Sequence, residues 1–157
     1  MTITRVEVSP KQGEGMRDVR GDMVQRQLAA DHNLIISNVR SAVGYLISSS
    51  ISGEHISQRI DDIFTDPIIE QGYCNSPAFS DELLFAEPPE LVITVGFKPG
   101  VTDNPGKAAQ DGFQTLFPEA TDRRFQRIFR MHSMAYLLKQ MPTTSLQACI
   151  TTSSKKQ

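Results

Sequence analysis

Two stretches of the chain, DVRGDMVQRQL from Asp18 to Leu28 and DNPGKAAQDGF from Asp103 to Phe113, share one pattern and decide the fold. Both read DxxGxxxQxxΦ, where Φ is apolar, and the matched positions all lie 85 residues apart. An aspartate just before a helix accepts a hydrogen bond from a free amide of the first turn, so each stretch predicts a capped helix. Similarity at one constant offset is typical of internal duplication. The sequence therefore predicts two copies of one unit.

Outward from the first stretch, the elements of an α+β unit follow each other. Branched apolar residues predict strands over 3–8 and 34–47, and the second is one long strand or, as we expect, two strands joined at Gly44. Apolar residues at helical spacing predict a helix over 55–64, followed by a strand over 68–73. The order strand-helix-strand-strand-helix-strand predicts a two-layer sandwich, in which helices cover one face of a small, mostly antiparallel sheet.

The second unit repeats this opening and then stops. A strand over 91–95 precedes the second capped helix, and no second helix or last strand is recognisable after it. Residues 127–138 have helical spacing, but their correspondence with 39–47 favours a strand. The expected organisation is a first module (1–74), a linker (75–90), an incomplete second module (91–138) and a flexible tail (139–157).

Composition excludes several classes of protein. The chain of 157 residues has 16 Lys and Arg against 18 Asp and Glu, so it lacks the basic excess of a nucleic-acid or membrane-surface binder. Cys74 and Cys149 are far apart and form no CxxC pair, which fits a reduced, cytoplasmic protein without structural zinc. No apolar run approaches the roughly 20 residues of a membrane span, and no signal core follows Arg5.

Candidate functional residues gather around the opening of the second unit. The Lys98-Pro99-Gly100 turn is similar to phosphate-binding turns, and arginines over 123–130 are the only local concentration of charge, suited to an oxyanion or an acidic partner surface. Turn formation, helix capping and a solvated strand edge explain the same residues without a ligand. The candidates for ligand binding or an interface are Lys98, Asp103, Asn104, Gly106, Arg127 and Arg130.

Residues with catalytic chemistry lack the neighbours that catalysis needs. Neither cysteine has a predicted base beside it, and no carboxylate is predicted next to His132. We therefore expect no catalytic residue, metal site or cofactor site in this chain.

Longer segments carry a resemblance to a known family. The segments VEVSPKQG, DVRGDMVQRQL, ISNVRSAVGYLI and ISQRIDDIFTDPIIEQGY together resemble PurS, the small subunit of phosphoribosylformylglycinamidine synthase. The segment VITVGFKPGVTDNPGKAAQDGF is similar to the opening of the same module, and tandem modules of this kind precede the catalytic domains in the long form of the synthase. The resemblance covers residues 3–138 and includes neither the synthetase region nor the glutaminase.

This resemblance implies a non-catalytic assembly module of de novo purine biosynthesis. The parent enzyme uses glutamine and ATP, with Mg, to convert formylglycinamide ribonucleotide to formylglycinamidine ribonucleotide. The expected partners are its synthetase and glutaminase parts, together with self-association through the sheet. The alternative from another class is a free-standing regulatory module that binds a small ligand between subunits, with a pocket containing Lys98, Asp103 and Arg130.

Overall fold

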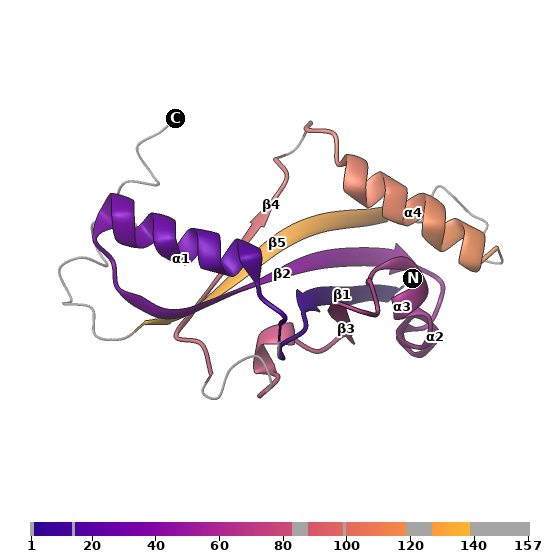
Figure 1. Ribbon diagram of the computed structural model, residues 1–157. Helices are drawn as coiled ribbons and strands as arrows, with labels where there is room; N and C mark the ends of the chain where they lie inside the picture. The colour runs from indigo at the N-terminus through magenta and orange to yellow at the C-terminus, as the bar shows by residue number, and fades with distance from the viewer. Residues whose placement is uncertain (1, 14, 83–87, 99, 119–126, 139–157) are drawn as a thin grey trace.

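One five-stranded antiparallel sheet, in the order β3-β1-β2-β5-β4, organises the structure (Figure 1). The structure, a computed structural model, describes residues 2–13, 15–82, 88–98, 100–118 and 127–138. The strands are β1 (Thr2–Pro10), β2 (Ile36–Ser49), β3 (Glu70–Cys74), β4 (Leu91–Gly96) and β5 (Arg127–Leu138). The helices are α1 (Val19–His32), α2 (Gly53–Gln58), α3 (Ile60–Ile63), the short 3₁₀ turn η1 (Ala78–Ser80) and α4 (Asn104–Leu116).

The four α-helices cover one face of this sheet (Figure 1). Alternate residues of a strand point to opposite faces, so Val6 and Val8 of β1 share the helix-covered face with Ile47 of β2. These three residues belong to the main core, together with buried residues of the helices. These are Ile56 of α2, Ile60 of α3 and Phe113 of α4, together with Phe64 and Phe117, which directly follow α3 and α4. A smaller cluster, Ile36 and Val39 with Val24 and Leu28, lies under α1.

The opposite face of the sheet is covered locally by η1. Ala78 and Phe79 of this turn are buried against Ala42 of β2, and Tyr73 of β3 packs beside them. The predicted linker therefore contains an ordered turn that closes part of the second face.

The fold class is confirmed as a two-layer α+β sandwich with an antiparallel sheet, but details of the expected element order are wrong. Gly44 does not divide the second strand, because β2 is bonded on both sides, with Gly44 paired to Glu7 of β1 and Met131 of β5. The expected helix over 55–64 is broken at Arg59, although its apolar face stays continuous. The last strand of the first unit begins at Glu70, because the Asp66 side chain holds a turn before it. Residues 127–138 form a strand, as the correspondence between the units predicted.

The two predicted units have the same order of elements, β1-α1-β2 and β4-α4-β5, within one sheet. Asp18 caps α1 by accepting a hydrogen bond from the Gly21 amide, and Asp103 caps α4 by accepting one from the Gly106 amide, each at 2.8 Å. A side chain on Gly21 would collide with the Val39 carbonyl oxygen. A side chain on Gly106 would collide in the same way with the Ile128 carbonyl oxygen. Each glycine thus lets a helix lie directly on its following strand.

The register places these units around an approximate two-fold axis. If Val39 and Ile128 are equivalent, then the residues four positions further on, Val43 and His132, are equivalent too, and they pair with each other between β2 and β5. That one unit arose as a copy of the other stays an interpretation, as do the predicted domain boundaries. The predicted tail over 139–157 lies outside the described residues.

Candidate functional site

The residues predicted for a site lie along the opening of the second unit. Asp103 is the N-cap of α4, Asn104 is its first residue, and Gly106 is buried in its first turn. Lys98 is exposed in the loop that leaves β4. The structure therefore brings Asp103, Asn104 and Gly106 together at one helix end, where capping and close helix–strand contact account for Asp103 and Gly106.

The predicted arginines are described only in part. Arg127 and Arg130 lie on β5, where their backbones pair with Ser48 and Tyr45 of β2. Nothing is described of their side chains, and Arg123 and Arg124 lie outside the described residues. The predicted arginine surface therefore stays a prediction.

A cavity of about 600 Å³ lies at the corresponding place in the first unit, between the β1–α1 loop and β2. The cationic residues at this cavity are Lys11, Arg17 and Arg20, and none of them is among the site residues predicted from the sequence. For one of these residues, Lys11, the sequence contains a signal in its spacing. Lys11 follows Val8 at the same distance as Lys98 follows Val95, and the strand registers place Val8 and Val95 at equivalent positions.

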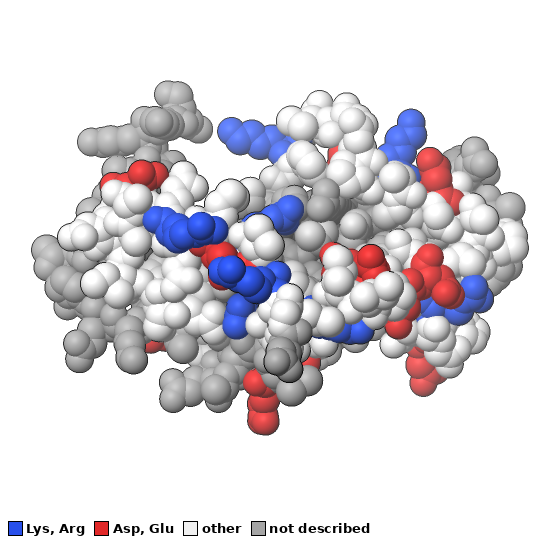
Figure 2. Space-filling model, viewed as in Figure 1, with Lys and Arg blue, Asp and Glu red and all other residues white. Residues whose placement is uncertain are grey.

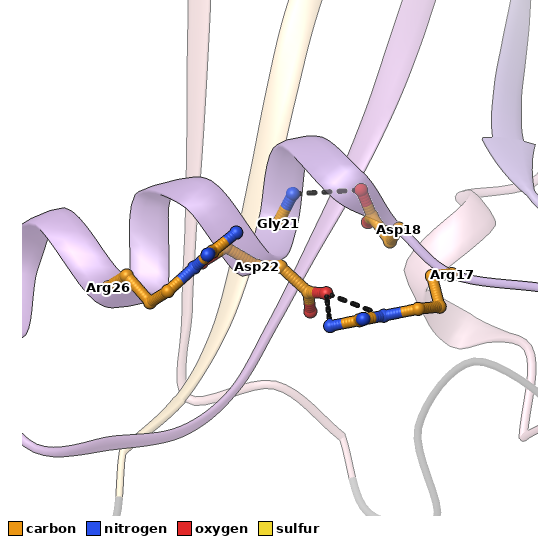
Figure 3. A network of polar contacts seen from close by, with 5 residues as sticks. All are labelled: Arg17, Asp18, Gly21, Asp22 and Arg26. Atoms are coloured by element: carbon orange, nitrogen blue, oxygen red, sulfur yellow. Dashed lines mark hydrogen bonds and ion pairs between the residues drawn. The ribbon is translucent and has the colours of Figure 1, made fainter.

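Asp18, in the wall of this cavity, is fully engaged in holding the first unit together. It is 1% exposed, and its Oδ1 accepts hydrogen bonds from the Gly21 amide at 2.8 Å (Figure 3) and the Ser41 hydroxyl at 2.7 Å. Its Oδ2 accepts a third from the Ser41 amide at 2.5 Å. The carboxylate therefore fastens the start of α1 to the middle of β2, and this task accounts for its burial without any ligand.

The cations around the cavity have protein partners as well. Arg17 donates two hydrogen bonds to Asp22 Oδ2, at 3.1 and 2.6 Å (Figure 3). Arg26, one turn further along α1, donates to the Asp22 carbonyl at 3.2 Å. Lys11 Nζ donates to the Pro67 carbonyl at 2.5 Å. Basic and acidic side chains are mixed on this face (Figure 2), so the cavity does not present one uncompensated charge.

An ion pair with a buried carboxylate lies on the opposite face of the sheet. Glu7, 1% exposed, forms an ion pair with Arg5 and accepts a 2.6 Å hydrogen bond from the Ala78 amide. Nearby, the Tyr73 hydroxyl donates to Asp81 Oδ2 at 2.7 Å. Burial and, secondarily, the Asp81 carboxylate raise the pKa of Tyr73. These contacts tie η1 and the residue after it to the sheet, which is a structural role.

Cys74 lacks the surroundings of a nucleophile. It lies at the end of β3, and its Sγ contacts the Gly53 carbonyl oxygen at 3.4 Å. Burial raises the pKa of the Cys74 thiol, which disfavours the reactive thiolate. Among the described residues, no three His, Cys, Asp or Glu side chains gather in a way that could hold a metal ion. None of the helices in these ranges is long and apolar enough to cross a membrane.

The strongest surface feature of the described chain is β4. Its apolar residues are all exposed, and Phe97 and Val101 in the following loop extend the apolar surface. Its inner edge pairs with β5, while no strand among the described residues pairs with its outer edge. An apolar strand with a free edge is a typical site for pairing with another chain. We refer to Leu91–Gly96 and its outer edge as the β4 surface.

Comparison with protein-family models, with curated proteins and with solved structures finds no match to this chain. What the chain does must therefore be inferred from its own residues and contacts.

Proposed function

We propose that the chain is a non-catalytic assembly module of phosphoribosylformylglycinamidine synthase, which acts in the cytoplasm in de novo purine biosynthesis. Its task is to bridge the synthetase and glutaminase parts of that enzyme. The observation that supports this proposal most is the joining of two like β-α-β units through β2 and β5 in one sheet. A bridge must hold two bodies in a fixed relation, and a continuous sheet does so because its strands cannot slide without breaking their ladder.

Rigidity matters for the parent reaction. Ammonia released by the glutaminase must reach the synthetase active site before it escapes into solvent. The ladder between β2 and β5 runs from the Ile36–Leu138 pair to the Ser48–Arg127 pair, so the two units share most of the length of their longest strands. Buried residues of both units, such as Val6 and Phe113, belong to one core. Parts docked on opposite ends of such a body would keep a constant separation.

The distribution of polar contacts also favours a binding role over catalysis in this chain. Asp18, Glu7 and Tyr73 use their hydrogen bonds to fasten elements of the fold to each other. The β4 surface, by contrast, is apolar and exposed. The partners that we propose are the two catalytic parts, with self-association through the sheet when those parts are absent. ATP and Mg would be bound by the synthetase part.

The direct test is to add the purified chain to separately produced synthetase and glutaminase parts. We expect the three to co-elute in size-exclusion chromatography with light scattering. We also expect the ratio of glutamate released to formylglycinamidine ribonucleotide formed to fall toward one, because the ammonia is then retained. Serum albumin at equal concentration is the control for nonspecific crowding. Failure to co-elute, with an unchanged ratio, would exclude the proposal.

The cavity beside Lys11, Arg17 and Arg20 favours a second candidate function, regulation by a small ligand. Thermal denaturation with ATP, glutamine or purine ribonucleotides distinguishes the two candidates, since a ligand that binds the folded state raises the melting temperature. The assembly proposal predicts no shift with any of them. A shift of several degrees that the substitution Arg17→Ala abolishes would favour the regulatory function instead.

A further inference from the structure

The strand registers identify β4 as the counterpart of β1. In the first unit, Val6 pairs with Tyr45, which lies six positions after Val39. In the second unit, Ile93 pairs with Met134, which lies six positions after Ile128. Since Val39 and Ile128 are equivalent, Val6 and Ile93 are equivalent too. The same count places Val8 with Val95 and Thr4 with Leu91. These three pairs therefore occupy equivalent positions on the helix-covered face.

Burial differs sharply between the counterparts. On β1, Thr4, Val6 and Val8 are 0%, 0% and 4% exposed. On β4, Leu91, Ile93 and Val95 are 38%, 42% and 61% exposed. The residue types do not explain this difference, since the more exposed strand is the more apolar of the two. It must come from what lies over and beside each strand.

The first unit shows what covers such a strand. β3 pairs antiparallel with the outer edge of β1, and α2 and α3 bring Ile56, Ile60 and Phe64 onto Val6 and Val8. Gly72 of β3 lies against the Ile60 side chain, so the covering helix and strand are fitted to each other. One helix–strand segment, residues 53–74, thus supplies both the backbone partner and the apolar cover.

The geometry points to a helix–strand segment of this same kind as the occupant of the β4 surface, contributed by a partner. The segment would add a sixth strand antiparallel to β4. It would also place two short consecutive helices, whose apolar residues have the i, i+4 and i+8 spacing of Ile56, Ile60 and Phe64, on Leu91, Ile93 and Val95. The inference rests on the assembly function proposed above for the identity of the protein that carries the segment. The β4 surface itself requires that the segment has a strand for the outer edge and an apolar helical face for the exposed row.

A second copy of the chain fits this surface less well. Two β4 strands paired about a two-fold axis would satisfy their backbone edges. Each would also bring its own exposed row, Leu91, Ile93 and Val95, onto the same face, so edge pairing would leave both rows uncovered. A helix–strand segment covers edge and face together, which is why we favour it.

The chain itself provides the probe. Residues 52–75 are appended after Gln157 through a flexible Gly/Ser linker of about 20 residues, which keeps the added segment at millimolar effective concentration. Hydrogen exchange of the amides of Leu91–Gly96 is then compared between the extended and the original chain. We expect at least a tenfold slowing, together with a rise in the melting temperature. An extension with the same residues in scrambled order is the matched control, and it should produce neither effect.

Two substitutions in the extended chain locate the contact. Ile93→Lys should remove the tenfold slowing, because the lysine would lie under the added helices. Ile3→Lys, at a residue that is 70% exposed on β1, should leave it in place. Exchange that is no slower than with the scrambled extension would overturn the inference. A dimer of the original chain that Ile93→Lys dissociates, and that the extension fails to displace, would identify a second copy as the occupant and overturn it as well.

This experiment and the test of the assembly function fail independently. Slowed exchange without co-elution with the synthetase and glutaminase parts would leave the β4 inference intact and exclude the proposed function. Co-elution without slowed exchange would support the proposed function and overturn the β4 inference.

Discussion

Val6 on β1 and Ile93 on β4 hold the same place in two β-α-β units, yet Val6 is inaccessible to solvent and Ile93 is 42% exposed. Both strands are rich in branched apolar residues, and both pair antiparallel with the next strand of their unit. Each is followed by a helix that an aspartate caps. Within the part of the chain that the structure describes, what differs is the helix–strand segment that follows β2 and covers β1. Local sequence therefore determines that a strand forms, whereas a segment tens of residues away determines whether its apolar face is buried.

The largest expected effect tests this contrast directly. A charge at Val6 would be buried without a partner, which costs several kcal/mol, so Val6→Asp should prevent stable folding at 25 °C. Ile93→Asp places the same charge at the equivalent position in contact with water, and should change the free energy of unfolding by less than about 1 kcal/mol. Urea unfolding followed by circular dichroism measures both. Equal losses would mean that the two strands are equally covered in solution.

The second largest expected effect is a difference in stability between substitutions of the two capping aspartates. Asp18→Ala removes three hydrogen bonds and leaves the buried Ser41 amide without its partner, so we expect a loss of about 3 kcal/mol. Asp103→Ala removes a helix cap at a half-buried position and should cost about 1 kcal/mol. The comparison uses the same urea titration, with Asp18→Asn as the variant that keeps one acceptor. A loss for Asp103 as large as that for Asp18 would show that the second cap is equally embedded.

The two glycines should behave alike, since both units use them in the same way. A Cβ at Gly21 would collide with the Val39 carbonyl oxygen, and one at Gly106 would lie 2.9 Å from the Ile128 carbonyl oxygen. Alanine at either position should cost about 2 kcal/mol, because the helix must move away from its strand. Gly112→Ala is the control on α4, where the added Cβ meets only Ile63 Cγ2 at 3.5 Å. That variant should gain about 0.5–1 kcal/mol from helix propensity.

The smallest expected effect is a pH dependence of the first unit. Folding raises the pKa of Tyr73, through burial and then Asp81, whereas the unfolded tyrosine loses its proton near pH 10. Above about pH 10 the folded state thus holds a proton that the unfolded state has released, so stability should fall as pH rises. Tyr73→Phe should flatten this fall in urea titrations between pH 9 and 11. An unchanged slope would show that the tyrosine is open to solvent.

Much of this architecture follows from sequence pattern. The repeated DxxG stretch predicted both capped helices, and the correspondence between units predicted β5 where periodicity alone favoured a helix. β5 forms because β2 and β4 flank it on both sides, and that pairing outweighs a local helical period. The apolar spacing of Ile56, Ile60 and Phe64 also predicted the buried face correctly, even though the helix is broken at Arg59.

Features that depend on distant contacts escaped sequence reasoning. Glu7 is buried because the amide of Ala78, 71 residues away, and the Arg5 guanidinium meet its carboxylate. No local sequence pattern predicts a contact between residues so far apart in the chain. Gly44 seemed a break because glycine weakens an isolated strand, but two neighbouring strands hold its backbone in place. At the candidate site, sequence reasoning found the helix-end residues of the second unit and missed the cavity of the first, whose walls come from β1, β2 and the loop between β1 and α1.

The pairing of β2 with β5 has a consequence for synthesis of the chain. The ladder joins Ser48 to Arg127 and Ile36 to Leu138, so about 80–90 residues must be translated after Ser49, the end of β2, before its second edge has a complete partner. At 5–20 residues per second this takes roughly 4–18 s, during which the first unit can form while the long edge of β2 stays open. A neighbouring nascent chain on the same messenger could pair with that edge. Slow or crowded translation should therefore favour strand-exchanged oligomers, and faster elongation should favour the closed monomer.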